Sequence, residues 1–225
     1  MPRRKLPLVE GEYYHIFNRS IDRKPIFIYK KDVLRAIKSL DFYRLAETNK
    51  VKFSDFNIWS DEKKQEFLEK FCDKNNHLVE ILSYCFMPNH YHFLLRQEKE
   101  DGISKFISQF QNSYTRFFNT KYKRKGHIFE GQFKAVRVET EEQLIHLSRY
   151  IHLNPYSSFV VKEINDLITY PYSSLMGYLS DKEGKFLNKE IILSHFKNKK
   201  AYKKFVFNQA DYQRELERIK HLLLE

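Results

Sequence analysis

The segment LSYCFMPNHYHFLLR, Leu82–Arg96, predicts an antiparallel β-hairpin. Two apolar, aromatic runs flank a break at Pro88-Asn89, and such a break between two β-rich runs is typical of a hairpin turn. We therefore expect one strand over Leu78–Met87 and a second over His90–Arg96.

The second predicted strand begins with His90-Tyr91-His92. Because side chains alternate between the two faces of a strand, the two histidines share one face, roughly 6.6 Å apart along the backbone. Tyr91 and Phe93 are expected on the opposite face. Two imidazoles on one face can bind one metal ion, but a polar, half-exposed strand face would give the same pattern.

Helices and further strands surround the hairpin, which indicates an α+β fold. We expect one sheet with helices packed on one face. Apolar spacing predicts a broad helical stripe after Asp101-Gly102, and a helix from Thr140 that Pro155 ends. The remaining expected elements are strands over Tyr13–Arg19 and Phe133–Val138, a helix over Lys31–Ala46, an inserted short helix within Val51–Asn76, and helices from Lys185 onward. We assign residues 1–180 to one domain and residues 181–225 to a helical C-terminal extension.

The composition favours a nucleic-acid partner. Among 225 residues, 40 are Lys or Arg and 29 are Asp or Glu, giving a net charge of +11. A basic excess of this size favours a polyanion, and nucleic acid before a membrane. No stretch is apolar enough to span a bilayer, and two cysteines make no disulfide framework, so a cytoplasmic location is expected.

A basic, aromatic segment follows the predicted Asp101-Gly102 helix. Lys121–Arg137, KYKRKGHIFEGQFKAVR, mixes cations with rings, a combination that suits phosphates and unpaired bases of single-stranded nucleic acid. A solvated basic loop is the alternative. The candidate DNA-binding residues are Lys121, Lys123, Arg124, Lys125, His127, Phe129, Lys134 and Arg137.

Tyr150 and Asn154 lie four residues apart in the helix predicted from Thr140. At this spacing their side chains are neighbours on the helix surface. If the helix packs on the sheet, it could direct a phenol and an amide oxygen toward the face of His90 and His92. Asn154 could then supply a third ligand to a metal ion, leaving positions open for a phosphate oxygen. The alternative for Tyr150 is a half-buried packing role.

Two signatures together resemble those of the HUH single-tyrosine transposases. They are Met87-Pro88-Asn89-His90-Tyr91-His92 and Tyr150-Ile151-His152-Leu153-Asn154-Pro155, and the similarity is to the REP-associated tyrosine transposase branch. Further matching stretches are Arg4–Phe27, Lys125–Phe133, Tyr172-Ser173-Ser174 and Tyr202-x-x-Phe205-Val206. The Val51–Asn76 segment is longer than this resemblance leads us to expect.

The resemblance implies a ferredoxin-like (RRM-like) core with an antiparallel sheet, a divalent metal (Mg²⁺ or Mn²⁺) and single-stranded or hairpin DNA as substrate. It also implies that His90, His92 and Asn154 hold the metal and that Tyr150 is the nucleophile. A transposase of this kind would act as a monomer or homodimer. A phosphotyrosine linkage retains the energy of the broken phosphodiester, so covalent catalysis favours strand transfer over hydrolysis.

Two other readings remain open from the sequence. A non-catalytic RNA- or single-stranded-DNA-binding module of the same fold class would explain the charge. A zinc-binding structural module could draw on soft ligands, although no C-x-x-C pair is present. Its candidate ligands would be Cys72, His77, Cys85, His90 and His92.

Overall fold

Four antiparallel strands form one sheet in the order β2-β3-β1-β4. A computed structural model describes residues 7–46, 51–71, 76–180 and 186–222. The strands are β1 (Tyr13–Arg19), β2 (Val79–Met87), β3 (His90–Gln97) and β4 (Lys134–Val138). Helix α1 (Lys30–Tyr43) links β1 to β2, and α4 (Gly102–Lys121) links β3 to β4. This βαββαβ order confirms the predicted α+β, ferredoxin-like class and the predicted hairpin.

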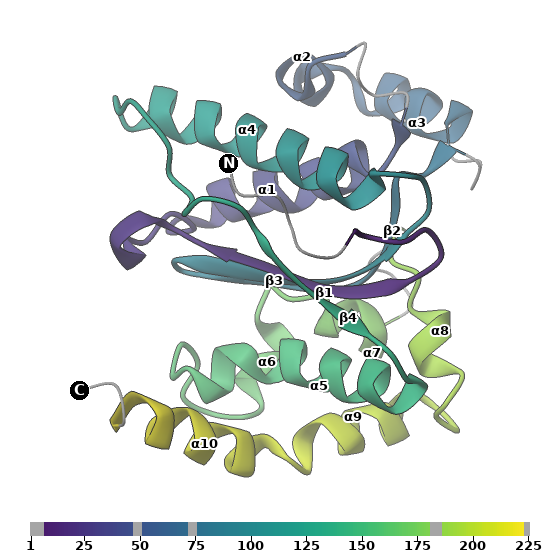
Figure 1. The fold of residues 1–225 in the computed structure, drawn as a ribbon, viewed down its shortest axis with the longest axis vertical. Helices are drawn as coiled ribbons and strands as arrows, with labels where there is room; N and C mark the ends of the chain where they lie inside the picture. The colour runs from purple at the N-terminus through teal and green to yellow at the C-terminus, as the bar shows by residue number, and fades with distance from the viewer. Residues whose placement is uncertain (1–6, 47–50, 72–75, 181–185, 223–225) are drawn as a thin grey trace.

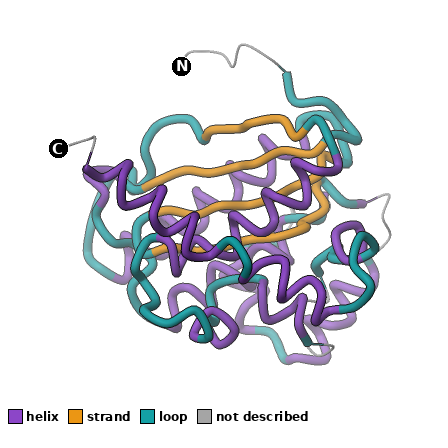
Figure 2. Tube along the Cα trace, turned by 90° about the horizontal axis from the view of Figure 1, so that it is seen from below, coloured by secondary structure: helices purple, strands orange, loops and turns teal. Residues whose placement is uncertain are grey.

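Helices cover both faces of the sheet, whereas we expected one covered face. Helices α1 and α4 lie on one side, and α5 (Glu141–Ser157) with the helices that follow it lies on the other (Figure 1). Seen from below, the strands lie side by side behind this second helical layer (Figure 2). The reason is that the second face is also apolar: Leu82 and Leu94 are fully buried there with Ile151.

The alternation along β3 divides its side chains as the sequence predicts. Tyr91 and Phe93 belong to the core beneath α1 and α4, where both are fully buried. In the pairing of β3 with β1, His90 lies opposite Arg19 and His92 lies opposite Phe17. His90 and His92 therefore belong to the α5 face.

Helix α4 buries the apolar stripe expected from its spacing. Its buried side chains include Phe106, Phe110 and Tyr114. The Tyr114 hydroxyl donates a hydrogen bond to the Ile26 carbonyl at 2.6 Å, and the ring is fully buried. Tyr114 is therefore a core residue.

The inserted segment forms two helices where one was expected. They are α2 (Phe53–Ile58) and α3 (Asp61–Lys70), and α3 begins with a Ser60 cap that accepts from Lys63 N. Phe53 and Phe56 form a small core with Phe42 of α1. The insertion thus packs on the α1 side of the molecule (Figure 1).

Helix α5 continues past Pro155, so the prediction that this residue ends the helix is wrong. The Thr140 side chain caps the helix by accepting from Gln143 N at 3.1 Å, as its sequence predicts. Proline removes its own N–H from the helical bonding, and its ring crowds the carbonyl four residues earlier, but neither effect removes the later N–H donors. The next donors still bond, because Ser158 N reaches the Asn154 carbonyl at 3.0 Å.

The C-terminal helices share a core with α5. This layer also contains the short helices α6 (Asp166–Thr169), α7 (Leu175–Leu179) and α8 (Glu190–Leu193), and then α9 (Lys199–Phe207) and α10 (Ala210–Leu222). Fully buried Tyr202 and Val206 of α9 belong to the same cluster as Ile151. Lys185, where we expected the helical pattern to begin, lies outside the described residues. None of the helices in the described parts is long and apolar enough to cross a membrane.

Candidate active site

The paired strands β1 and β3 bring three histidines together on the α5 face. The ring centres of His90 and His92 lie 5.0 Å apart, and that of His15 lies 5.1 Å from His92. His15 was not among the residues singled out from the sequence. Its signal was present, because the alternation along Tyr13–Arg19 places it on the same face as Phe17 and Arg19.

The Nδ1 atom of each β3 histidine lies within hydrogen-bond distance of a neighbouring side chain. Nδ1 of His90 lies 2.6 Å from the Asn89 Oδ1, and the amide nitrogen of Asn89 in turn donates to the Arg23 carbonyl at 3.0 Å. An amide oxygen only accepts, so His90 donates from Nδ1, and in the neutral ring the lone pair is then on Nε2. This is the arrangement that commonly orients a metal-binding histidine.

His92 has a comparable contact with His15. Nδ1 of His92 lies 2.9 Å from Nε2 of His15. Burial lowers the pKa of His15 to about 4, so this ring is neutral at pH 7 and can accept a hydrogen bond. When His92 donates from Nδ1, its lone pair is on Nε2, as in His90.

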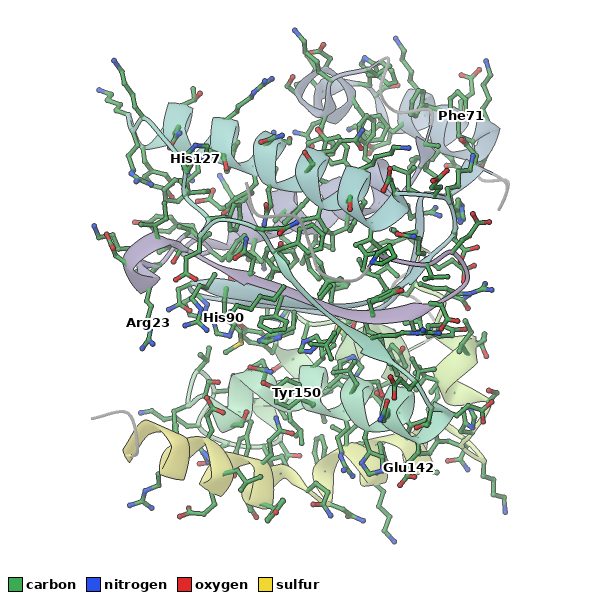
Figure 3. The ribbon with its side chains drawn as sticks, viewed as in Figure 1. Arg23, Phe71, His90, His127, Glu142 and Tyr150 are labelled. Carbon is green, nitrogen blue, oxygen red and sulfur yellow. The ribbon has the colours of Figure 1, made fainter. Side chains whose placement is uncertain are left out.

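Helix α5 places Tyr150 and Asn154 opposite these histidines. The Tyr150 ring meets His92 and His15 edge-on, with ring centres 5.8 Å and 6.0 Å apart. Asn154 is buried, and its amide nitrogen points toward the Tyr150 carbonyl at 3.5 Å. That orientation leaves the amide oxygen as the atom available to a ligand. Figure 3 shows Tyr150 on α5 below the sheet that carries His90.

The far side of α5 is fixed by a buried polar network. His152 is fully buried between the Tyr202 hydroxyl, 2.8 Å from Nδ1, and the Ser174 hydroxyl, 2.8 Å from Nε2. Burial lowers the pKa of His152 to about 3, so the ring is neutral at pH 7. The network holds the helical turn between Tyr150 and Asn154 in one orientation.

A cavity of about 570 Å³ is lined by all four residues that the sequence predicts as nucleophile and metal ligands. His90, His92, Tyr150 and Asn154 all line it, together with His15. Other charged residues that line it are Arg19, Arg23, Glu130, Lys134 and Glu217. The arginines were not singled out from the sequence, since only the folded β1 end and the turn after it bring them to the histidines. The cavity combines a phenol, imidazoles and cations, which suits a phosphodiester.

Among the predicted DNA-binding residues, Lys134 lines this cavity and the others lie elsewhere. Lys121 forms an ion pair with buried Asp32, and Arg137 pairs with Glu12 at 2.8 Å. His127 lies on the α4 side of the sheet, away from Tyr150 (Figure 3). The loop cations Lys123, Arg124 and Lys125 are exposed.

Phe129 packs in the core beneath α1 and α4. Its ring is buried and lies 5.9 Å from Tyr91 and 6.4 Å from Phe27 and Tyr114, centre to centre. This burial favours core packing, the alternative to base stacking, for this residue.

The donor set of the cavity fits a divalent cation held by nitrogen and amide oxygen. No group of three His, Cys, Asp or Glu in the described part of the chain is arranged to hold a metal ion. Two imidazoles with Nε2 lone pairs and the Asn154 oxygen are therefore what this face offers. Such a set would bind Mn²⁺ or Zn²⁺ more tightly than Mg²⁺, so the metal bound depends on which ion is available.

The zinc-module reading gains no support from its other residues. Cys72 lies outside the described residues, and Cys85 is fully buried beside Met87. Nε2 of His77 lies 2.7 Å from a guanidinium nitrogen of Arg44. The positive charge of that guanidinium disfavours a metal ion at the same nitrogen.

Comparison with known proteins identifies the family of this chain. The sequence profile of IS200-like transposases matches residues 43–154, a span that contains both the β3 histidines and the Tyr150–Asn154 turn. The chain belongs to the IS200-like transposase family. No curated protein matches its sequence significantly.

A solved structure shares the fold of this transposase chain. It is that of a REP-associated tyrosine transposase bound to a REP hairpin, with a TM-score of 0.53 and 15% sequence identity. The similarity covers 80% of this chain and 86% of that one. At this level of identity the match shows the shared architecture alone.

Proposed function

We propose that this protein cleaves single-stranded DNA and rejoins it elsewhere, through a covalent phosphotyrosine at Tyr150. The observation that carries the proposal is the single cavity into which Tyr150, His90, His92 and Asn154 converge from α5 and β3. Membership of the transposase family supports DNA strand transfer as the outcome.

In this proposal His90, His92 and Asn154 hold a divalent ion, Mg²⁺ or Mn²⁺. When bound, the ion would draw electron density from a phosphate oxygen and lower the barrier to attack at phosphorus. Asn89 and His15 would keep the two imidazoles in the tautomer that presents Nε2.

The chain's own residues account for the remaining steps. Arg19, Arg23 and Lys134 would hold the phosphates that flank the scissile bond. The Tyr150 oxygen would attack phosphorus, a new O–P bond would form, and the bond to the departing sugar oxygen would break. The departing end would take up a proton as Tyr150 loses one. Attack by a second DNA end would reverse these changes and free Tyr150.

We infer that hairpin-forming DNA is the partner, as in the REP-associated branch. The structurally similar transposase is itself bound to a REP hairpin, and the net charge of +11 here suits a polyanion. A cytoplasmic location and a monomeric or homodimeric state remain predictions from the sequence.

A labelled single-stranded oligonucleotide that contains a hairpin tests the proposal. Incubation with Mn²⁺ or Mg²⁺ should yield a shortened labelled strand, and EDTA should abolish the product. A non-catalytic RNA- or single-stranded-DNA-binding module would bind the oligonucleotide with or without EDTA and leave it intact. Intact DNA under all metal conditions, with binding retained, would therefore reject the enzymatic proposal.

A further inference from the structure

The segment that follows α5 places an exposed aromatic ring beside the Tyr150 cavity. Phe159 is 54% exposed, and its neighbours Ser158 and Val160 both line that cavity. The backbone of Phe159 has a φ of 58°, in the left-handed region that bulky side chains rarely adopt. A large apolar side chain therefore occupies a strained position and remains largely in solvent.

Folding alone gives no reason for phenylalanine at this position. Glycine would adopt the same backbone without strain, and an exposed ring gains little from the hydrophobic effect. Strained residues of this kind cluster at functional sites, where the surrounding structure holds them in place. The position of Phe159 beside the cavity therefore favours a role in binding.

Phe159 is the outer member of a stack that begins inside the protein, where α10 packs along α5 (Figure 1). The guanidinium carbon of Arg214, on α10, lies 3.9 Å from the centre of the Tyr156 ring and 4.4 Å from that of Phe159. Tyr156 is buried, and its hydroxyl donates to Asp211 at 2.8 Å. The stack thus runs from a buried tyrosine through an arginine to an exposed phenylalanine.

Backbone acceptors fix the arginine in the middle of this stack. Nη1 of Arg214 donates to the Lys162 carbonyl at 3.2 Å, and Nη2 donates to the Val161 carbonyl at 3.5 Å. Arg214 contacts one face of the Phe159 ring, which leaves the opposite face for a planar ligand. A ring that is already held in one orientation loses little side-chain entropy when a ligand stacks on it.

From these observations we propose that Phe159 is a stacking platform for one unpaired base of the DNA strand that enters the Tyr150 cavity. The proposal rests on the proposed function and adds a contact to the same substrate. A nucleobase suits the site, because aromatic side chains bind unpaired bases of any sequence by stacking. Ser158 and Val160 join the ring to the cavity, so a base could reach Phe159 while cavity cations hold the phosphates.

The alternative is a structural role, in which the Phe159 ring only covers Arg214 and Tyr156. Three substitutions distinguish the two roles. Phe159→Gly removes the ring and permits the left-handed backbone, Phe159→Leu keeps an apolar side chain without a flat face, and Phe159→Trp keeps a ring. Tyr212→Ala is the matched control, because it removes a ring that is 65% exposed on α10 and does not line the cavity.

Two single strands of equal length serve as probes, oligo(dT) and a wholly abasic strand with the same phosphates. Affinities are measured in EDTA, so that binding is separated from cleavage, and thermal melting checks each fold. Phe159→Gly and Phe159→Leu should bind oligo(dT) roughly tenfold more weakly than wild type, since one base–aromatic stack contributes about that much. Phe159→Trp should retain wild-type affinity. On the abasic strand every variant should match wild type, with an unchanged salt dependence, because no charge is removed.

Wild-type affinity of Phe159→Gly for oligo(dT) would overturn the proposal, and a lowered melting temperature in that case would assign the ring the covering role. An equal loss on the abasic strand, or an equal loss in Tyr212→Ala, would also overturn it. Failure of wild type to cleave the hairpin-containing oligonucleotide with Mg²⁺ or Mn²⁺ would instead reject the proposed function. The base-dependent difference in affinity would still be measured in that case, so the two failures are distinguishable.

Discussion

His15 and His92 lie in hydrogen-bond contact, with Nε2 of His15 2.9 Å from Nδ1 of His92. One histidine comes from β1 and the other from β3, so the contact exists only in the assembled sheet. In our account it fixes the tautomer and orientation of His92.

The first prediction concerns this contact. His15→Phe keeps a ring against Phe17 and Tyr150 but removes both nitrogen atoms. We expect it to weaken Mn²⁺ binding roughly 10- to 100-fold, because the orienting partner of a metal ligand is lost. Calorimetric titration of the folded variant with Mn²⁺ measures the affinity. His146→Phe, an exposed position on α5, is the control, and an affinity in His15→Phe equal to that control would argue against this role.

The second prediction concerns the proposed ligands themselves. His90→Ala, His92→Ala and Asn154→Ala should each reduce metal-dependent cleavage of single-stranded DNA, by at least roughly tenfold for the histidines. The effect of Asn154→Ala should be smaller, since the imidazoles of His90 and His92 would both remain to hold the ion. Cleavage rates are measured across a titration of Mg²⁺ and Mn²⁺. Undiminished activity of His92→Ala would remove this site from consideration.

The third prediction concerns stability at mildly acidic pH. The pKa of His152 falls from 6.5 to about 3 on burial, so between these values the unfolded chain binds a proton that the folded chain does not. This contribution to stability is complete above pH 6.5 and declines as pH falls. At pH 5 it should lower the free energy of unfolding by about 2 kcal/mol relative to pH 7.

His152→Gln isolates that contribution, because glutamine can hydrogen-bond to Tyr202 and Ser174 but does not titrate. Urea unfolding of both proteins at pH 7 and pH 5 gives the two differences. Between pH 7 and pH 5, the free energy of unfolding of the variant should fall by about 2 kcal/mol less than that of wild type. An identical loss in both proteins would mean that His152 is protonated in the folded state.

Much of the fold could be predicted from local sequence because the decisive signals are local. Alternation around His90-Tyr91-His92 predicts which face each side chain takes, and Thr140 with Gln143 predicts the start of α5. The error at Pro155 arose because the residue before a proline prefers extended over helical geometry. The buried position of Asn154 and the continued bonding at Ser158 outweigh that preference in the folded chain.

The site could be predicted in part, for a physical reason. Tyr150 and Asn154 are neighbours within one helix, and His90 and His92 within one strand, so their spacing in sequence fixes their spacing in space. His15, Arg19 and Arg23 join them through the pairing of β1 with β3 and through the turn that follows β1. Alternation along β1 indicates that His15 and Arg19 share a face, but it does not indicate which strand pairs with β1. The second helical layer was missed for the same reason, since it depends on which apolar faces meet.

The choice of nucleophile is the central claim, and the two candidate tyrosines differ clearly in the structure. Tyr150 lines the cavity with both β3 histidines, whereas Tyr114 is fully buried and hydrogen-bonded to the Ile26 carbonyl. Burial also raises the pKa of Tyr114, which disfavours its phenolate. Tyr114→Phe should cost about 1–3 kcal/mol of stability, since a buried carbonyl loses its partner.

Mapping the covalent tyrosyl–DNA adduct tests that claim most directly. Wild type, Tyr150→Phe and Tyr114→Phe are each incubated with Mn²⁺ and a single-stranded oligonucleotide that contains a hairpin. Each sample is then digested and analysed by mass spectrometry. We predict an adduct on Tyr150 in wild type and in Tyr114→Phe, and none in Tyr150→Phe, which should still fold and bind DNA. An adduct on Tyr114, or one that persists in Tyr150→Phe, would contradict the account.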